Sequence, residues 1–381
     1  MPDARFNVLV DGERLDPRVL SLLGRLEIRE SDSAPAVAVL RLSLRQLPDG
    51  RFTPIDDSTF DPVTSIAIEV EAPGGLPVTL FNGFVTHIRP HYEEIEANCY
   101  VEILAADHAT ILQAEERIAA YPDATDSEAV EQVFRRYRLP VRVEDTPARY
   151  TEDEHLLVQR GSDWAFVQML AARNGFVCYL EPDEGTGDIT AHFASPAFDA
   201  DPQADLLTQM PGANLRWLDL QFSASGPVRH VASSIEPLGK RVVRADGAAR
   251  LTDLGAESAK DTVEPALTAV GVGAATALLD EPLPMGPALE AQSSGISDSD
   301  RLVIEGRGEL DPSAYRGLLR ARRPVLLRGV GETFSGIYYV RTVRTILDEG
   351  AISQTFTMVR NAIRVEGREE FGQSAEEVGP Q

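Results

Sequence analysis

The first 112 residues alternate apolar and polar positions in short runs. The runs RLEIRE, AVAVLRLSLRQL, SIAIEVEAP and NCYVEILAAD keep a period of two, and Gly, Pro, Asp and Ser separate them. Such alternation with turn residues between runs is typical of short antiparallel strands. The pattern predicts a barrel or a sandwich in this part of the chain.

The period lengthens between residues 126 and 200. In SEAVEQVFRRYRLP the apolar side chains fall on one helical face, with Asp126 or Ser127 as the expected N-cap and Pro140 as the end. FVCYL and GDITAHFAS then predict a hairpin across the turn PDEGTG. We therefore expect a small α/β insertion on an otherwise β protein.

The segment RGSDWAFVQMLAARNGFVCYL, residues 160–180, predicts a helix followed by a strand. Ser162 is the expected N-cap with Asp163 supporting the helix start, and an Asn-Gly pair ending at Gly175 is the expected C-cap. We interpret Trp164 as a core anchor of the helix and Cys178 as a strand residue that faces packing.

Strand patterns return after residue 205, and the region 240–300 interrupts them. That region is rich in Ala, Gly, Pro and Ser, so we expect a loop with one short helix near 287–293. SAYRGLLRAR predicts another helix at 313–322. Three strands then lead to a polar tail.

Two distant stretches share a pattern. Phe81-Asn82-Gly83-Phe84 resembles Phe334-Ser335-Gly336-Ile337, and in each case a valine and an apolar-Arg pair follow, namely Val85 with Ile88-Arg89 and Val340 with Val343-Arg344. The match requires a two-residue insertion, Tyr338-Tyr339. It predicts two related β units, one near each terminus.

The charge balance and composition exclude several classes of protein. The chain has 36 Lys and Arg against 60 Asp and Glu, a net charge of -24, which repels phosphate backbones. Hydrophobic residues at 43% indicate a folded protein, and no run is long enough for a membrane span. The start lacks the pattern of a signal peptide, so we expect cytoplasmic synthesis without a membrane anchor. Cys99 and Cys178 are expected to be buried thiols.

The chain lacks complete motifs for binding nucleotides or metals. Gly239-Lys240 lacks a phosphate-binding loop, and Gly271-Val272-Gly273 lacks the third glycine of a dinucleotide loop. His87 and His91 have zincin spacing, but on a strand they lie roughly 13 Å apart. We therefore expect no metal and no cofactor.

Candidates for catalysis are equally sparse. Asp107-His108 has no identifiable serine partner, and no nucleophile motif is present. Paired carboxylates suited to glycoside hydrolysis stay possible among 60 acids. We name no catalytic residue and expect no enzyme.

Two stretches resemble a known family. Residues 162–180, with Ser-Asp-Trp-x-Phe, Leu-Ala-x-x-Asn-Gly and a strand containing Tyr179, are similar to the signature of the late control D proteins. These are central hub proteins of contractile phage tails, and their fold also forms the N-terminal part of VgrG proteins. The Phe-Ser-Gly turn, the Tyr-Tyr-Val strand and the closing Arg360-Asn361 resemble the last hairpin of that family.

The resemblance implies a mainly β fold with α/β insertions and two tube-like antiparallel β-barrels per chain, assembled as a homotrimer with a pseudo-six-fold ring. It implies a first barrel at 1–120, an α/β insertion at 121–205, the start of a second barrel with an irregular insertion at 206–312, closing strands at 313–363 and a polar tail at 364–381.

The implied function is that of a baseplate hub that adapts a six-fold tail tube to a three-fold spike and lines the channel. Its partners would be two further copies, a separate spike protein, the tail tube or a tube-initiator protein, and baseplate wedge proteins, with no sequence-specific nucleic acid. An acidic lumen would let cargo slide. Two alternatives are a tail-associated cell-wall hydrolase that uses paired carboxylates and a β-barrel chaperone or secreted adaptor.

Overall fold

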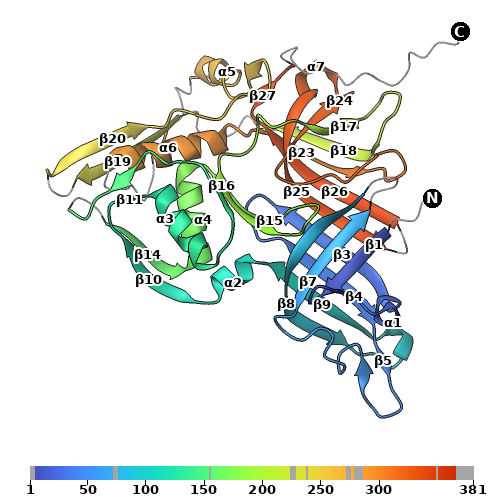
Figure 1. Cartoon of the computed structure of the whole chain (residues 1–381). Helices are drawn as coiled ribbons and strands as arrows, with labels where there is room; N and C mark the ends of the chain where they lie inside the picture. Colours follow the sequence, from blue (N-terminus) through green and yellow to red (C-terminus); the bar gives the residue numbers. More distant parts are fainter. Residues whose placement is uncertain are drawn as a thin grey trace, which may run out of the picture.

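The structure is a computed structural model that describes residues 5–71, 76–153, 156–223, 229–236, 239–271, 276–278, 286–348 and 351–365. Most of its regular elements are strands in antiparallel sheets (Figure 1). The expected mainly β class is therefore confirmed.

One sheet of thirteen strands runs through both halves of the chain. Its main path is β18 (Leu215–Phe222), β23 (Ile304–Leu310), β26 (Ala351–Arg360), β25 (Gly336–Asp348), β3 (Leu23–Ser31), β4 (Val37–Ser43), β9 (Tyr100–Asp107), β8 (Pro77–His91), β7 (Ser65–Glu71), β1 (Arg5–Val10) and β2 (Glu13–Arg14). β24 (Pro324–Arg328) also pairs with β25, and β17 (Gln203–Leu207) pairs with β24. The two halves meet where β25 pairs with β3, from Thr342 opposite Ser31 to Asp348 opposite Arg25.

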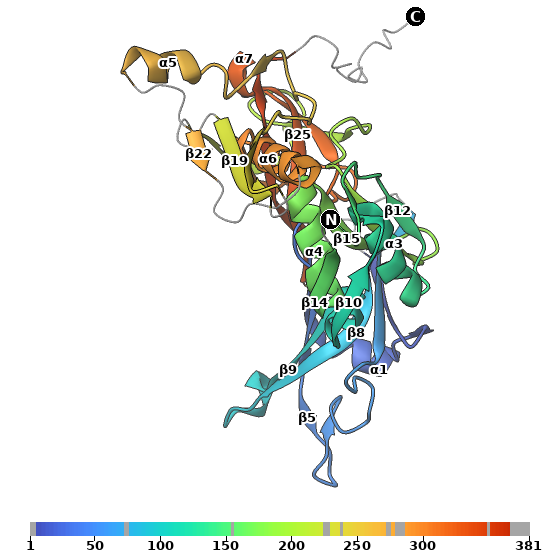
Figure 2. The ribbon, with the colours of Figure 1, turned by 90° about the vertical axis from the view of Figure 1, so that its left-hand side faces the viewer.

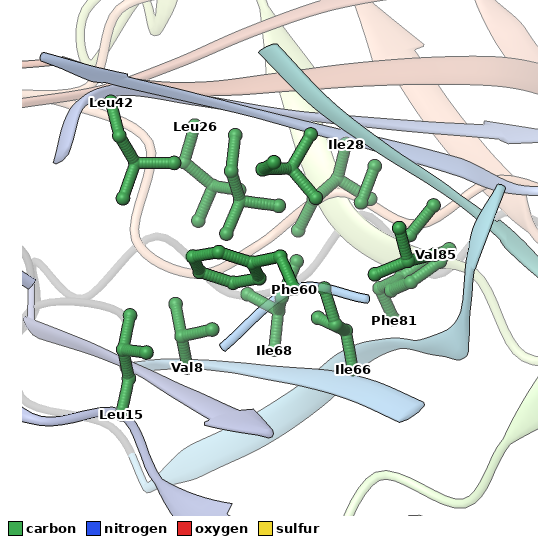
Figure 3. Close-up of a cluster of buried hydrophobic side chains, with 14 of the residues drawn as sticks. Val8, Leu15, Leu26, Ile28, Leu42, Phe60, Ile66, Ile68, Phe81 and Val85 are labelled. Atoms are coloured by element: carbon green, nitrogen blue, oxygen red, sulfur yellow. The ribbon is translucent and has the colours of Figure 1, made fainter. Parts of the chain in front are cut away.

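Each half of the sheet curls around an apolar core. In the N-terminal half, Val8 and Ile68 lie across Phe60 from Leu26 and Ile28 (Figure 3). A second core lies under β18, β23, β25 and β26. The family resemblance implied two tube-like β-barrels, whereas the strands of the described residues form two curled halves of one open sheet. Alternation determines which side chains face a core, but the pairing of strands depends on long-range register.

The insertion contains short sheets and three helices on one side of the large sheet (Figure 1). Its elements are α2 (Ala109–Gln113), β10 (Glu116–Tyr121), β11 (Ala124–Thr125), α3 (Asp126–Arg136), β12 (Val141–Val143), β13 (Arg149–Tyr150), β14 (Leu157–Ser162), α4 (Asp163–Asn174), β15 (Val177–Pro182) and β16 (Ile189–Ala194). The apolar faces of α3 and α4 share one buried cluster with β15 and β16. The expected hairpin is present as β15 and β16.

The caps of α4 were predicted correctly, and the cap of α3 was not. The Ser162 hydroxyl accepts a hydrogen bond from the amide of Ala165, and Gly175 ends α4 with a φ of 69°. α3 is capped by Thr125 rather than by Asp126 or Ser127. Thr125 and Glu128 form a reciprocal capping box, in which each side chain accepts from the other backbone N–H.

The described part of the region 240–300 contains more regular structure than predicted. It contains β20 (Arg241–Asp246), β21 (Glu257–Ser258), α5 (Glu264–Ala269), β22 (Thr276–Leu278) and α6 (Gly286–Asp300), and β19 (Arg229–Glu236) precedes it. The helix expected at 287–293 is part of the longer α6. β19 and β20 form a ribbon that packs on α6 beside α4 (Figure 2). Ala and Gly positions are used here for close approach, since a Cβ on Gly295 would lie 2.5 Å from the Gly175 nitrogen.

The helix predicted at 313–322 is absent, and the segment runs irregularly before β24. Gln354 binds both the N–H and the carbonyl of Leu319, and Gln203 accepts from the N–H of Arg320. Gly317 has a φ of 134°, which is incompatible with a helix. Side chains of buried strands therefore replace the hydrogen bonds of a helix.

The other elements are short. They are α1 (Pro17–Leu20), β5 (Arg45–Gln46), β6 (Phe52–Thr53), the 3-10 helix η1 (Glu96–Asn98), α7 (Gly331–Phe334) and β27 (Ala362–Ile363). β27 pairs with β21 and so ties the end of the described chain to the 240–300 region. The polar tail predicted at 364–381 lies outside the described residues beyond Val365.

Candidate functional site

The histidines and cysteines of the sequence analysis do not converge on a site. The His91 ring stacks on Tyr100 and contacts Glu93, while His87 contacts its neighbour Thr86. Both cysteines are free and buried as expected, and burial raises the pKa of the Cys178 thiol. Among the described residues, no group of three His, Cys, Asp or Glu side chains could hold a metal ion.

Asp107 lies at the end of β9, where it has a structural role. Its carboxylate accepts from the N–H of Ala36 at 2.6 Å and from the N–H of Ala109 at 2.9 Å. Burial raises the pKa of Asp107 to about 6, against the opposing effect of these hydrogen bonds. The His108 ring packs edge-on against Phe84, and burial lowers its pKa. The pair therefore anchors the start of α2.

Asp163, in the segment that carries the family resemblance, is fully buried and accepts three hydrogen bonds. The donors are Arg136 Nη1 at 2.8 Å, the Tyr137 hydroxyl at 2.7 Å and Gln159 Nε2 at 2.6 Å. Trp164 is 6% exposed and belongs to the core of the insertion, as predicted. The signature thus encodes a joint between α3, α4 and β14.

The closing Arg360-Asn361 pair holds three loops together. The buried Arg360 guanidinium donates to the carbonyls of Leu254 at 2.9 Å, Ser335 at 2.8 Å and Arg364 at 2.7 Å. The Asn361 side chain accepts from the Leu254 N–H at 2.8 Å. A Cβ on Gly336 would lie 2.4 Å from Arg360 Nη2, so the Phe-Ser-Gly turn needs its glycine to make room for the guanidinium.

A buried ion network lies behind the β25–β3 pairing. Glu30 of β3 accepts from Arg320 Nε at 2.9 Å and from Arg322 Nη2 at 3.3 Å. Arg320 also donates to Glu184 at 2.9 Å, and Glu181 lies 3.5 Å from Arg320. Burial alone would raise the pKa of Glu181, but the nearby arginines outweigh it and lower that pKa. The network joins the two halves of the sheet to the insertion.

No motif in the sequence predicted this network. The available signal was the run Arg-Ala-Arg-Arg at 320–323, directly before a buried strand. Arginines that enter a core require buried acidic partners, but only the fold shows that Glu30 and Glu181 are those partners.

The two halves of the sheet repeat the same order of strands. In chain order the N-terminal set is β1, β3, β4, β7, β8 and β9, and the C-terminal set is β17, β18, β23, β24, β25 and β26. Across the sheet the two sets run β3-β4-β9-β8-β7-β1 and β18-β23-β26-β25-β24-β17. The one difference in direction is that β1 is antiparallel to β7 and β17 is parallel to β24. The shared order supports the internal repeat expected from the sequence.

The candidate functional site is the surface where the two repeats meet. β25 pairs first with β24 and then with β3, and the second pairing is the seam between the repeats. On the polar face of the seam, Arg344 donates to both carboxylate oxygens of Glu27, at 2.8 and 2.7 Å, and these hydrogen bonds lower the pKa of Glu27 to about 2. The seam therefore has an apolar side, a buried ion network and a charge-paired face.

Solved structures with a similar fold include tail proteins and a type VI secretion protein. The tail protein from Neisseria meningitidis MC58 matches with a TM-score of 0.61 at 12% identity, over 95% of this chain and 98% of that one. The 43 kDa tail protein of prophage MuSo2 from Shewanella oneidensis matches with a TM-score of 0.62 at 12% identity, over 94% and 99%. The E. coli c3393 protein, a type VI secretion component described as similar to the T4 tail proteins gp27 and gp5, has a TM-score of 0.52 at 11% identity, over 94% and 76%.

These similarities define the class of the fold as that of phage tail and type VI secretion proteins. The chain belongs to the family described as the Alg8 N-terminal domain, whose model matches residues 3–261. No curated protein matches the chain. None of the described helices is long and apolar enough to cross a membrane.

Proposed function

We propose that this chain is a structural hub in the baseplate of a contractile injection machine, such as a phage tail, a tailocin or a phage-derived injection system. It acts as a homotrimer, without catalysis, and adapts a six-fold tail tube to a three-fold spike. Its other partners are a separate spike protein, the tail tube or a tube-initiator protein, and baseplate wedge proteins.

The observation that carries this proposal is the repeated order of six strands within one sheet. A protein with two similar units per chain presents six pseudo-equivalent units when three copies form a closed ring. Such a ring offers a six-fold surface to a tube and a three-fold surface to a spike. The fold shared with tail proteins supports the same role.

We further propose that the polar face of the sheet lines the channel. On this face Asp219 contacts Arg307 at 3.1 Å, and Glu27 contacts Arg344 at 2.7 Å. At these two points the wall carries compensated charges, although the chain as a whole has a net charge of -24. Paired charges leave little net field to hold a passing polymer.

The test is the mass of the purified chain by light scattering together with electron microscopy of the particle. We expect three times 41.5 kDa and a ring with a central opening. A chain that stays monomeric both in solution and in the assembled particle contradicts the proposal. Cell-wall cleavage on zymograms that one Asp or Glu substitution abolishes would instead favour the hydrolase.

A further inference from the structure

The seam between the two repeats provides a template for a contact between chains. Along it, Val343 of β25 lies opposite Glu30 of β3, and Arg344 lies opposite Arg29. Val343 is 1% exposed, and Leu26 and Ile28 of β3 are buried to the same degree. Pairing at the seam thus completes the burial of both strands.

The ladder of the sheet fixes which residues of the two repeats are equivalent. Counting across paired strands gives the rows Val85, Ala105, Ala38, Ile28 in the N-terminal repeat and Val340, Met358, Gly306, Leu220 in the C-terminal repeat. Val85 therefore corresponds to Val340, as the sequence alignment predicted. Ile28 of β3 corresponds to Leu220 of β18.

The two strands equivalent to those of the seam have open edges. β18 pairs with β23, and β8 pairs with β7 only as far as Phe84; the described residues supply no strand for the outer edge of β18 or for β8 from His87 to His91. Ile88, the equivalent of Val343, is only partly buried, and so are Leu218 and Leu220, the equivalents of Leu26 and Ile28. The repeats thus contain one completed seam and two halves of a second.

We propose that β8 of one copy pairs antiparallel with β18 of the next copy in the register of the internal seam. Ile88 then lies opposite Phe222 of the partner subunit, and Arg89 lies opposite Gln221 of the partner subunit. This inference rests on the proposed trimer and specifies its interface. Because the same strand pairing joins the repeats within a chain and between chains, the contacts continue around one ring.

An ion pair distinguishes this register from others. Arg89 is equivalent to Arg344, and Asp219 is equivalent to Glu27. Arg89 is exposed and has no ion pair within the described chain, and Asp219 has only a surface contact with Arg307, in which their side chains are 62% and 70% exposed. The proposed register brings Arg89 to Asp219 of the partner subunit. Pro90 stands where the internal seam has Thr345 and provides no N–H, so this contact is expected to be the weaker one.

Cross-linking tests the register. Arg89→Cys with Gln221→Cys places two exposed thiols on directly opposite residues, whose Cα atoms are about 5 Å apart in an antiparallel pair, within reach of a disulfide. We expect covalent dimers and trimers on denaturing gels after mild oxidation. Arg89→Cys with Arg216→Cys is the matched control, since Arg216 lies about 17 Å further along the strand. The buried Cys99 and Cys178 do not interfere.

Charge exchange gives an independent readout. Arg89→Asp and Asp219→Arg should each raise the protein concentration at which half of the trimer dissociates by about fivefold, typical of one exposed ion pair, and the double variant should restore it. A trimer whose matched thiols link no better than the control pair overturns the register and leaves the hub intact. A wild-type chain that stays monomeric both in solution and in the assembled particle overturns both.

Discussion

Replacement of Arg360 by methionine tests whether the closing Arg-Asn motif is structural. The guanidinium makes three hydrogen bonds of 2.7 to 2.9 Å to backbone carbonyls that lie in three different loops. Methionine fills much of the same volume but has no donor, so these carbonyls lose their bonds to a charged group. At about 1.5 to 3 kcal/mol for each such bond, and with partial rescue by water, we expect a loss of about 5 kcal/mol.

The assay is urea unfolding at one fixed protein concentration, followed by tryptophan fluorescence. Trp217 reports on the C-terminal repeat and Trp164 on the insertion, and the chain has two tryptophans, so Trp164→Phe isolates the first signal. Arg364→Met is the matched control, because its side chain is 58% exposed and pairs with the exposed Glu257, a contact worth about 1 kcal/mol or less. If the free energy of unfolding of Arg360→Met lies within about 1 kcal/mol of the wild-type value, the hydrogen bonds of the Arg360 guanidinium do not explain the motif.

Three further changes probe the insertion and the seam. Trp164→Ala should lower the free energy of unfolding by about 3 to 5 kcal/mol in urea and lower the yield of trimer in light scattering. If the variant assembles normally and loses only an activity, Trp164 belongs to an active site instead. Asp163→Asn should cost about 3 kcal/mol, because it removes the charge at a fully buried position that pairs with the half-buried Arg136. The exposed control Glu131→Gln should cost less than about 0.5 kcal/mol, and equal unfolding midpoints of the two variants would contradict this. The pKa of Glu27 falls from an ordinary 4.5 to about 2 on folding, so its stabilising effect is complete at neutral pH and is lost as the pH falls through this range; Glu27→Gln should remove that part of the acid sensitivity, and unchanged acid profiles would refute the coupling.

Local patterns predicted the elements well where local forces decide them. The alternation of β4, β7 and β9 gave strands, and the capping residues of α4 gave both ends of that helix. The helix at 313–322 failed because its backbone groups bind Gln354 and Gln203, which are distant in sequence. The order within 240–300 was missed because small residues there serve close packing, which carries no periodic signal.

The difference between local patterns and contacts distant in sequence also limited what could be predicted of the site. Burial of Trp164 and Cys178 followed from their positions in a helix and a strand. The partners of Arg320 lie in β3, in β15 and in the turn after β15, and no local pattern connects Arg320 with Glu30, which is 290 positions away. Two tube-like barrels were expected from the family resemblance, and alternation alone cannot show whether a curled sheet closes on itself or continues into a neighbour.

The position of a β-bulge connects the repeat to the proposed assembly. In β25 the pairing with β26 shifts by one residue between Val340 and Thr342, and in β8 the pairing with β9 shifts between Val85 and His87. In β25 the bulge is the point where the strand leaves β24 and begins to pair with β3. β8 has the same bulge where it leaves β7, although no described strand of its own chain follows. A bulge bends a strand and increases its twist, which redirects the edge beyond it. A bend that serves one seam inside the chain is therefore also present at the edge for which we propose a second seam between chains.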